Sequence, residues 1–183
     1  MRAVISVLCL VLLPIPLAAQ SPADLDALET RATAVFTAGQ TQDAISLFTR
    51  LRAGRRLTKA AALEARALWH LTVAYRSLGH SGEAIKSGLA GLDLARRTEA
   101  HATIAELLAQ LYQLGHFVAE FPTAQAQLDE ALRRAQLAND PRTRARVHDT
   151  RARWLAETNA LEAALAEVSE GLNWARAGGD AAQ

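Results

Sequence analysis

The residues best suited to chemistry in this chain are arginines and a tryptophan spaced along one helical face. Arg66, Trp69, Val73 and Arg76 follow one another at intervals of three and four residues, which places their side chains on the same side of a helix. Tryptophan and arginine are enriched at binding hot spots, and a guanidinium group binds a carboxylate through parallel hydrogen bonds. This face therefore predicts a surface for a protein or peptide partner that carries acidic or C-terminal carboxylate groups.

Two later segments carry a corresponding face. Tyr112 lies on the first of these faces, and Arg146 and Arg153 lie on the second. The residues predicted to line the binding surface are Arg66, Trp69, Val73, Arg76, Tyr112, Arg146 and Arg153. The alternative is that Trp69 packs between neighbouring segments and that the arginines are simply solvated.

No catalytic constellation accompanies these side chains. The five histidines show no metal-ligand spacing such as HExxH, and the chain contains neither a glycine-rich phosphate loop nor GxSxG. The single cysteine, Cys9, lies in the leader described below, so the rest of the chain offers no thiol nucleophile. We therefore expect no catalytic residues, metal or cofactor, and keep an enzyme with an unrecognised site only as an alternative.

The charge balance gives no reason to expect nucleic acid as a partner. The net charge is +1 over 183 residues, so no overall field attracts a polyanion. The most basic run extends from Arg50 to Lys59 and includes Arg52, Arg55 and Arg56, with no aromatic residue among them. Single-stranded nucleic acid needs aromatic side chains for stacking, so this run predicts a solvated turn.

The elements that must position the binding residues repeat along the chain. Ala44, Ala84, Ala124 and Ala164 stand forty residues apart, each within a related segment. Such a period is typical of stacked helical repeats, each unable to bury its apolar face alone. Alanine and leucine, which favour helices, supply most of the apolar residues. The sequence thus predicts an all-α domain of four helix hairpins, at about residues 22–56, 57–97, 98–139 and 140–178.

Capping and turn residues mark the ends of these helices. Ser21 before Pro22 and Asp140 before Pro141 are typical helix starts. Glycines close the first helix of three hairpins, at positions 39, 79 and 115. The third connection is longer than the others, so either its turn is extended or its first helix runs further before Pro122.

The fourth hairpin departs from the pattern of the others. Asn159 stands where the other hairpins have a turn glycine, and with Glu162 it has the spacing of a capping box. The last helix carries an apolar stripe made of Leu161, Leu165, Val168 and Leu172. Trp174 lies on the opposite side, where it is expected to cover the end of the stack or to meet another repeat or subunit. The alternative is a tryptophan packed on its own helix.

The run Leu68-x-x-Leu71-Thr72-x-x-Tyr75-x-x-x-Gly79-x-x-x-x-Ala84 resembles a tetratricopeptide repeat. The resemblance extends over about residues 22–178 and implies a right-handed α-α superhelix whose first helices line a concave groove. In that family, extended peptides or partner helices bind in the groove. The period of forty residues exceeds the usual unit of about 34 residues, the closing proline is absent, and the lysine-and-asparagine carboxylate clamp of some relatives is missing.

Residues 1–19 have the layout of a secretory signal peptide. Arg2 precedes an apolar run, two prolines interrupt it at positions 14 and 16, and Ala19 offers a small residue for cleavage. Cleavage after Ala19 would leave a domain of residues 20–183, periplasmic or secreted and without a membrane span. The alternative is a leader retained as a membrane anchor.

Together these features predict an exported, non-catalytic scaffold that binds a peptide or helix of a partner protein in its groove. The alternative is the extracytoplasmic sensory or scaffolding segment of a signalling system. That alternative is suggested by the sequence after Gly178, because repeat stacks usually end in a polar capping helix and none is read there. Self-association through the C-terminal end of the stack is a further expectation.

Overall fold

The computed structural model describes residues 21–115, 118 and 121–180, and the regular structure of this part is entirely helical. The helices are α1 Pro22–Thr37, α2 Thr41–Leu57, α3 Ala61–Ser77, α4 Ser81–Arg97, α5 His101–Gln113, α6 Ala124–Ala138, α7 Pro141–Glu157 and α8 Leu161–Asp180. The all-α prediction is confirmed. The expected signal peptide at residues 1–19 lies outside the described residues.

Two predicted helix starts have the expected chemistry. The side chains of Ser21 and Asp24 each accept a hydrogen bond from the other's backbone N–H, which forms a capping box at α1. Asp140 accepts from the backbone N–H groups of Arg142 and Thr143 at the start of α7. Each cap satisfies backbone donors that have no partner within the helix, and so defines where the helix begins.

Each turn between the described helices contains a residue in the left-handed backbone conformation, which in the third hairpin is Gly115. These residues recur every twenty positions outside the third hairpin, at Gly39, Lys59, Gly79, Glu99, Asn139 and Asn159. Asn159, with φ of 63°, adopts the conformation that glycine supplies in the first two hairpins. The predicted capping box at Asn159 and Glu162 is wrong, because α8 begins at Leu161 and Asn159 belongs to the turn.

The third hairpin has an extended turn and two shortened helices. Helix α3 ends at Ser77, so a period of forty residues would end α5 at position 117. Instead α5 ends at Gln113, and α6 starts only at Ala124. The alternative of a longer first helix is therefore wrong. The buried amide of Gln127 bridges the gap: its Nε2 donates to the carbonyl of Leu108 and its Oε1 accepts from the N–H of Val118, both at 2.9 Å. The forty-residue period survives, because α6 ends close to its expected position.

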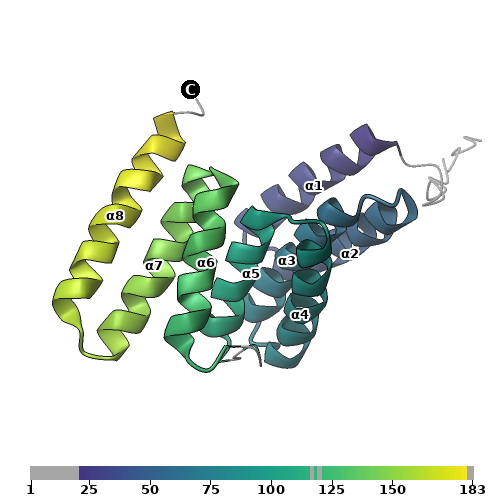
Figure 1. Cartoon of the computed structure of the whole chain (residues 1–183). Helices are drawn as coiled ribbons and strands as arrows, with labels where there is room; N and C mark the ends of the chain where they lie inside the picture. Colours follow the sequence, from purple (N-terminus) through teal and green to yellow (C-terminus); the bar gives the residue numbers. More distant parts are fainter. Residues whose placement is uncertain (1–20, 116–117, 119–120, 181–183) are drawn as a thin grey trace, which may run out of the picture.

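Each helix packs against the next one along the chain, and α5 also contacts both α3 and α7. The hairpins therefore lie side by side, with α1 and α2 at one end and α7 and α8 at the other (Figure 1). Close crossings need small residues: a Cβ atom on Gly91 of α4 would lie 3.1 Å from the Cβ of Leu68 and from Cδ1 of Leu107. Helix α4 can thus approach α3 and α5 together only because position 91 has no side chain.

Helix α8 packs on α7 through small residues, and its leucines face solvent. Its buried residues are Ala164, Gly171 and Gly178, spaced seven apart. The apolar stripe is exposed instead, by 59% at Leu161, 71% at Leu165, 45% at Val168 and 52% at Leu172. Small residues allow close approach of the two helices, so the large apolar side chains lie beside the contact, where Leu161, Leu165 and Val168 line an open pocket with Ala152 and Ala156 of α7.

Trp174 packs against α7. The guanidinium carbon of Arg144 lies 4.3 Å from the centroid of its ring, a cation–π geometry. The expectation that Trp174 covers the end of the stack is therefore wrong, because its ring lies against Arg144 of α7. Within the described residues, no helix has the length and apolar content needed to span a membrane.

Candidate binding groove

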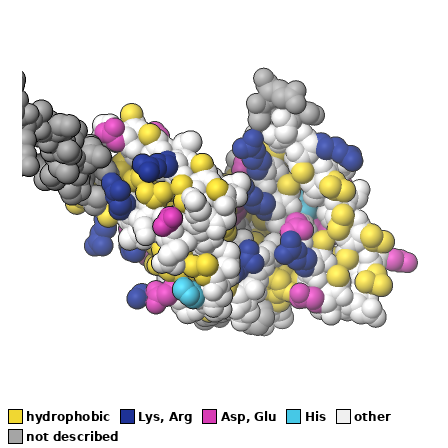
Figure 2. Space-filling model, turned by 180° about the vertical axis from the view of Figure 1, so that it is seen from behind, with side chains coloured by type: hydrophobic (Ala, Val, Ile, Leu, Met, Phe, Trp, Pro, Cys, Tyr) yellow, Lys and Arg dark blue, Asp and Glu magenta, His cyan; other side chains and the backbone are white. Residues whose placement is uncertain are grey.

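An open groove of about 1420 Å³ runs along the first helices of the four hairpins. Helix α1 contributes Thr33 and Thr37, α3 contributes Val73, α5 contributes Thr103, and α7 contributes Thr143. Figure 2 shows the molecule hollowed between its two ends, with basic and acidic side chains along the hollow. The lining combines threonines and charged side chains with apolar residues such as Ala34 and Phe36, a surface that suits an extended chain.

A smaller cavity of about 150 Å³ adjoins the groove between α3, α5 and α7. Of the residues predicted to bind, Arg66, Trp69, Val73 and Arg146 line the groove, and Trp69, Arg76, Arg146 and Arg153 line the small cavity. Trp69 and Arg146 belong to both, so the two spaces are continuous at these side chains. The helical spacing read from the sequence thus brings six of the seven predicted residues together.

Tyr112 is the exception and lines neither space. Its hydroxyl donates to Oε2 of Glu157 at 2.8 Å, which joins the ends of α5 and α7. Burial and this hydrogen bond raise the pKa of Tyr112 to about 12. The prediction that Tyr112 lines the groove is wrong, because α5 ends one residue later and Tyr112 is directed along the helix end towards α7.

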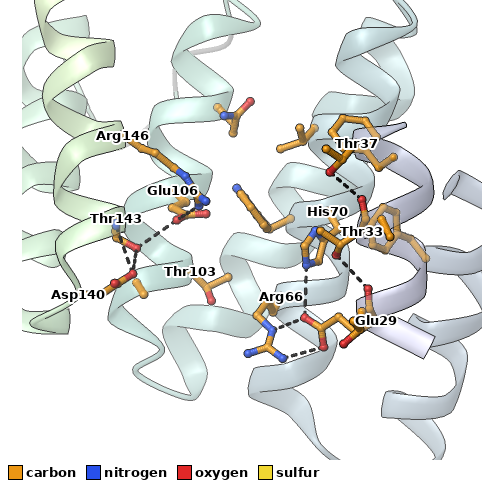
Figure 3. A pocket seen from close by; sticks show the side chains of 18 of the residues that line it. Glu29, Thr33, Thr37, Arg66, His70, Thr103, Glu106, Asp140, Thr143 and Arg146 are labelled. Atoms are coloured by element: carbon orange, nitrogen blue, oxygen red, sulfur yellow. Dashed lines mark hydrogen bonds and ion pairs between the residues drawn. The ribbon is translucent and has the colours of Figure 1, made fainter. Parts of the chain in front are cut away.

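One wall of the groove is organised around Glu29, which the sequence did not single out. Arg66 binds both of its oxygens, with Nε 2.6 Å from Oε1 and Nη2 2.7 Å from Oε2, and Nε2 of His70 lies 3.3 Å from Oε1 (Figure 3). Burial opposes ionisation, but the hydrogen bonds from His70 and Arg66 outweigh it and hold the pKa of Glu29 at about 2.

Arg55 lies behind this wall. The prediction that the basic run from Arg50 to Lys59 forms a solvated turn is wrong at this residue. Its side chain is only 2% exposed, and it pairs with Asp26 and, at 3.5 Å, with Glu29. Arg55 is on the buried face of α2, from which its long side chain reaches the carboxylates of α1. A buried charge of this kind is tolerated only where it is paired.

The opposite wall contains a second carboxylate with its own partners. Oε1 of the buried Glu106 accepts from Nη1 of Arg146 at 2.5 Å and from Oγ1 of Thr143 at 3.1 Å. Burial raises the pKa of Glu106 even though Arg146 acts in the other direction. Figure 3 shows this cluster facing the Glu29 cluster across the groove. Arg66 and Arg146 are therefore neutralised by the chain's own carboxylates.

Trp69 lies at the junction of the groove and the small cavity. The guanidinium carbon of Arg146 lies 5.2 Å from its ring centroid, and the ring of His70 lies 4.6 Å away. Part of the indole also packs against the core. Trp69 thus combines the two alternatives read from the sequence, since it packs between hairpins and also lines the cavities.

Threonines of α1 are groove residues that the sequence reading missed. Thr30, Thr33 and Thr37 each donate a hydrogen bond to the backbone carbonyl four residues earlier. Their hydroxyl oxygens keep lone pairs that can accept from a ligand's N–H groups. Their spacing of three and four residues was the only signal, and it is shared by any polar helix face.

Within the described residues, no group of three or more histidine, cysteine or acidic side chains could hold a metal ion. Neither the comparison with protein-family models nor the search of curated proteins gives a match to this chain. The interpretation of the groove therefore depends on its own geometry.

Proposed function

We propose that this chain is an exported, non-catalytic interaction module, built as a right-handed superhelix of four tetratricopeptide-like repeats. In this proposal its groove binds an extended peptide or a helix of a partner protein. The observation that carries the proposal is the groove of about 1420 Å³ lined by the first helix of every hairpin. Export, to the periplasm or beyond the cell, is proposed from the leader at residues 1–19 alone.

The lining supports recognition of an extended backbone. The threonine oxygens of α1 can accept from backbone N–H groups of a ligand, and Val73 and Trp69 offer apolar contact on the adjacent helix. The large charged groups on both walls are already paired within the chain, so they set the shape of the groove without large changes on binding. Preorganised side chains lower the entropic cost of association.

Self-association through α8 is a second part of the proposal, with a second copy of this chain as the occupant. The stripe Leu161, Leu165, Val168 and Leu172 has intervals of four, three and four residues, the spacing of an antiparallel or parallel coiled-coil seam. All four residues are at least 45% exposed. Because the same stripe is present on each copy, it can pair with itself about a two-fold axis.

The groove is tested by selecting peptides from a random library on the chain and measuring their affinity for two variants. Thr33→Trp places a bulky side chain in the groove, and Thr49→Trp places the same side chain on α2, outside the groove. The two positions are matched, because each threonine hydroxyl donates to the carbonyl four residues earlier. We expect Thr33→Trp to weaken binding at least tenfold and Thr49→Trp to leave it unchanged. Equal effects of the two variants would contradict the proposal.

A further inference from the structure

The small cavity contains three buried polar atoms that have no hydrogen-bond partner within the described part of the chain. These atoms are Nε1 of Trp69, Nε of Arg76 and Oε1 of Gln110, and all three side chains line the cavity. Native proteins satisfy the great majority of their buried polar groups, since an unmet donor or acceptor is costly. Three unmet groups around one cavity therefore indicate that a ligand completes them.

The charges around the cavity are unbalanced at Arg76. Arg146 is paired with Glu106, and Nη2 of Arg153 lies 2.7 Å from Oδ2 of Asp149. No ion pair joins Arg76 to a carboxylate among the residues that the structure describes. Burial, and then the nearby charge of Arg153, lower the pKa of Arg76. An anion in the cavity would supply the counter-charge that this guanidinium lacks.

The unmet groups also specify the shape of the ligand. The Nε1–H of Trp69 and the Nε–H of Arg76 can only donate hydrogen bonds, so two donors are available to one anionic group. Arg76 can add a second, parallel hydrogen bond from one of its Nη atoms. Oε1 of Gln110 can only accept, so it requires an N–H close to that anion. A carboxylate with an amide N–H a few bonds away has this combination, as an acylated amino acid does.

The size and the remaining charges of the cavity favour a singly charged anion. Its volume of about 150 Å³ accommodates one small group, and the carboxylates of Glu106 and Asp149 also line it. Because these two carboxylates are already paired with Arg146 and Arg153, one positive charge, that of Arg76, is left to balance, and a single carboxylate balances it where a dianion would add an excess negative charge.

We propose that the cavity between Trp69, Arg76 and Gln110 binds the carboxylate of one amino acid of the peptide held in the groove. The carboxylate belongs either to an aspartate or glutamate side chain or to the peptide's C-terminus, and the neighbouring amide N–H donates to Gln110. This inference rests on the proposed function, since the cavity opens into the groove at Trp69 and Arg146. It assigns carboxylate binding to Arg76, whereas Arg66, Arg146 and Arg153 are paired with carboxylates of the chain, and removal of Arg153 would leave Asp149 unpaired at the cavity.

Nuclear magnetic resonance of the ¹⁵N-labelled chain tests the proposal with small probes. N-acetylglutamate α-amide carries a side-chain carboxylate, N-acetylalanine carries a terminal carboxylate, and N-acetylglutamine α-amide is a neutral control. We expect saturable shifts of the Trp69 Nε1–H and Arg76 Nε–H resonances with one or both carboxylates, and no such shifts with the neutral probe. The carboxylate that saturates at lower concentration identifies the source.

Three variants locate the effect. Arg76→Gln should abolish saturation within the same concentration range, and the exposed Arg153→Gln should weaken binding several-fold in a chain that still folds. Arg97→Gln is the control, because Arg97 also pairs with the aspartate four residues earlier, Asp93, but lines neither the groove nor the small cavity, and it should leave the titration unchanged. Circular dichroism confirms that each variant is folded.

The proposal is overturned if the carboxylates leave both resonances unshifted, if folded Arg76→Gln and Arg153→Gln variants bind as the original chain does, or if inorganic phosphate binds more tightly. In each of these cases the loss of peptide binding in Thr33→Trp would still support the groove. Conversely, carboxylate binding in the small cavity without any peptide binding in the groove would support this site and contradict the proposed function.

Discussion

At the scale of single residues, the groove depends on carboxylates that hold its arginines in place. Glu29 accepts from Arg66 and His70 and approaches Arg55, so one side chain joins α1, α2 and α3. Hydrogen bonds to ionised groups are stronger than those between neutral ones. Glu29 is therefore both a lining residue and a structural centre of the first two hairpins.

The low pKa of Glu29 predicts a loss of stability in acid. Its pKa is about 2 in the folded chain against an ordinary value of 4.5, so its contribution is complete above pH 4.5 and is lost as the pH falls towards 2. Between pH 6 and pH 3 we expect Glu29 to account for about 1–2 kcal/mol of the decrease in unfolding free energy. Urea unfolding of the original chain and Glu29→Gln at both pH values measures this. Parallel pH dependence in the two proteins would contradict the assignment.

The arginines show what residue spacing can and cannot predict. The intervals between Arg66, Trp69 and Arg76 were enough to place these side chains together, because helical geometry alone decides which residues share a face. The partners of those arginines come from helices far away in the sequence, as Glu29 does for Arg66 and Glu106 for Arg146. Local periodicity carries no information about such pairs, so the sequence could not tell free arginines from neutralised ones.

At the scale of helices, the sequence predicted the hairpins well because each turn is specified locally. Glycine or asparagine in the left-handed conformation closes the turn within a hairpin at positions 39, 79 and 159. Lys59 and Glu99 adopt the same conformation between hairpins without any residue preference that would reveal it. The shortening of α5 was likewise hidden, because it depends on the side chain of Gln127 bonding to Leu108 and Val118.

Two of the glycines of α4 predict opposite effects of the same substitution. Gly91→Ala forces a methyl group to within 3.1 Å of Leu68 and Leu107, and should destabilise the chain by about 1–3 kcal/mol. Gly82→Ala meets nothing within 4 Å and should stabilise it by about 0.5 kcal/mol through reduced entropy of the unfolded chain. Thermal or urea unfolding of both variants is the measurement. Stabilisation by both would mean that α4 does not cross α3 and α5 as closely as described.

Helix α8 shows how an amphipathic pattern can mislead about which face is buried. Its leucine stripe has the periodicity of a core-facing surface, yet the buried residues are Ala164, Gly171 and Gly178. Packing between α7 and α8 requires small residues: a Cβ atom on Gly178 would lie 3.1 Å from Cγ of Arg142. Periodicity identifies an apolar face, but not which neighbour covers it.

At the scale of the whole molecule, the exposed stripe predicts association of two copies. We expect sedimentation velocity to show a concentration-dependent increase in mass, because pairing removes four large apolar side chains per copy from water. Leu165→Ser should shift the equilibrium towards monomer at least tenfold. Leu137→Ser is the matched control, since Leu137 is a similarly exposed leucine, at 63%, on α6. A monomer at all concentrations, or equal effects of the two variants, would contradict this arrangement.

The whole molecule thus presents two surfaces of different character. The groove along α1, α3, α5 and α7 combines paired charged side chains with apolar ones, whereas the leucine stripe of α8 is apolar throughout. The two surfaces meet at α7, because Asp149 and Arg153 line the small cavity and also the pocket that contains Leu161, Leu165 and Val168. A dimer formed through the stripe would therefore lie beside the small cavity, and we expect self-association to change the affinity for a carboxylate.

A crystal structure of the chain with a library-selected peptide tests directly whether the groove is the binding site. We expect the peptide to lie along the first helices, in contact with Thr33 and Val73, with a carboxylate in the small cavity beside Arg76. A peptide bound to the leucine stripe of α8, or to the outer surface of α2, α4 and α6, would contradict the assignment of the groove as the binding site.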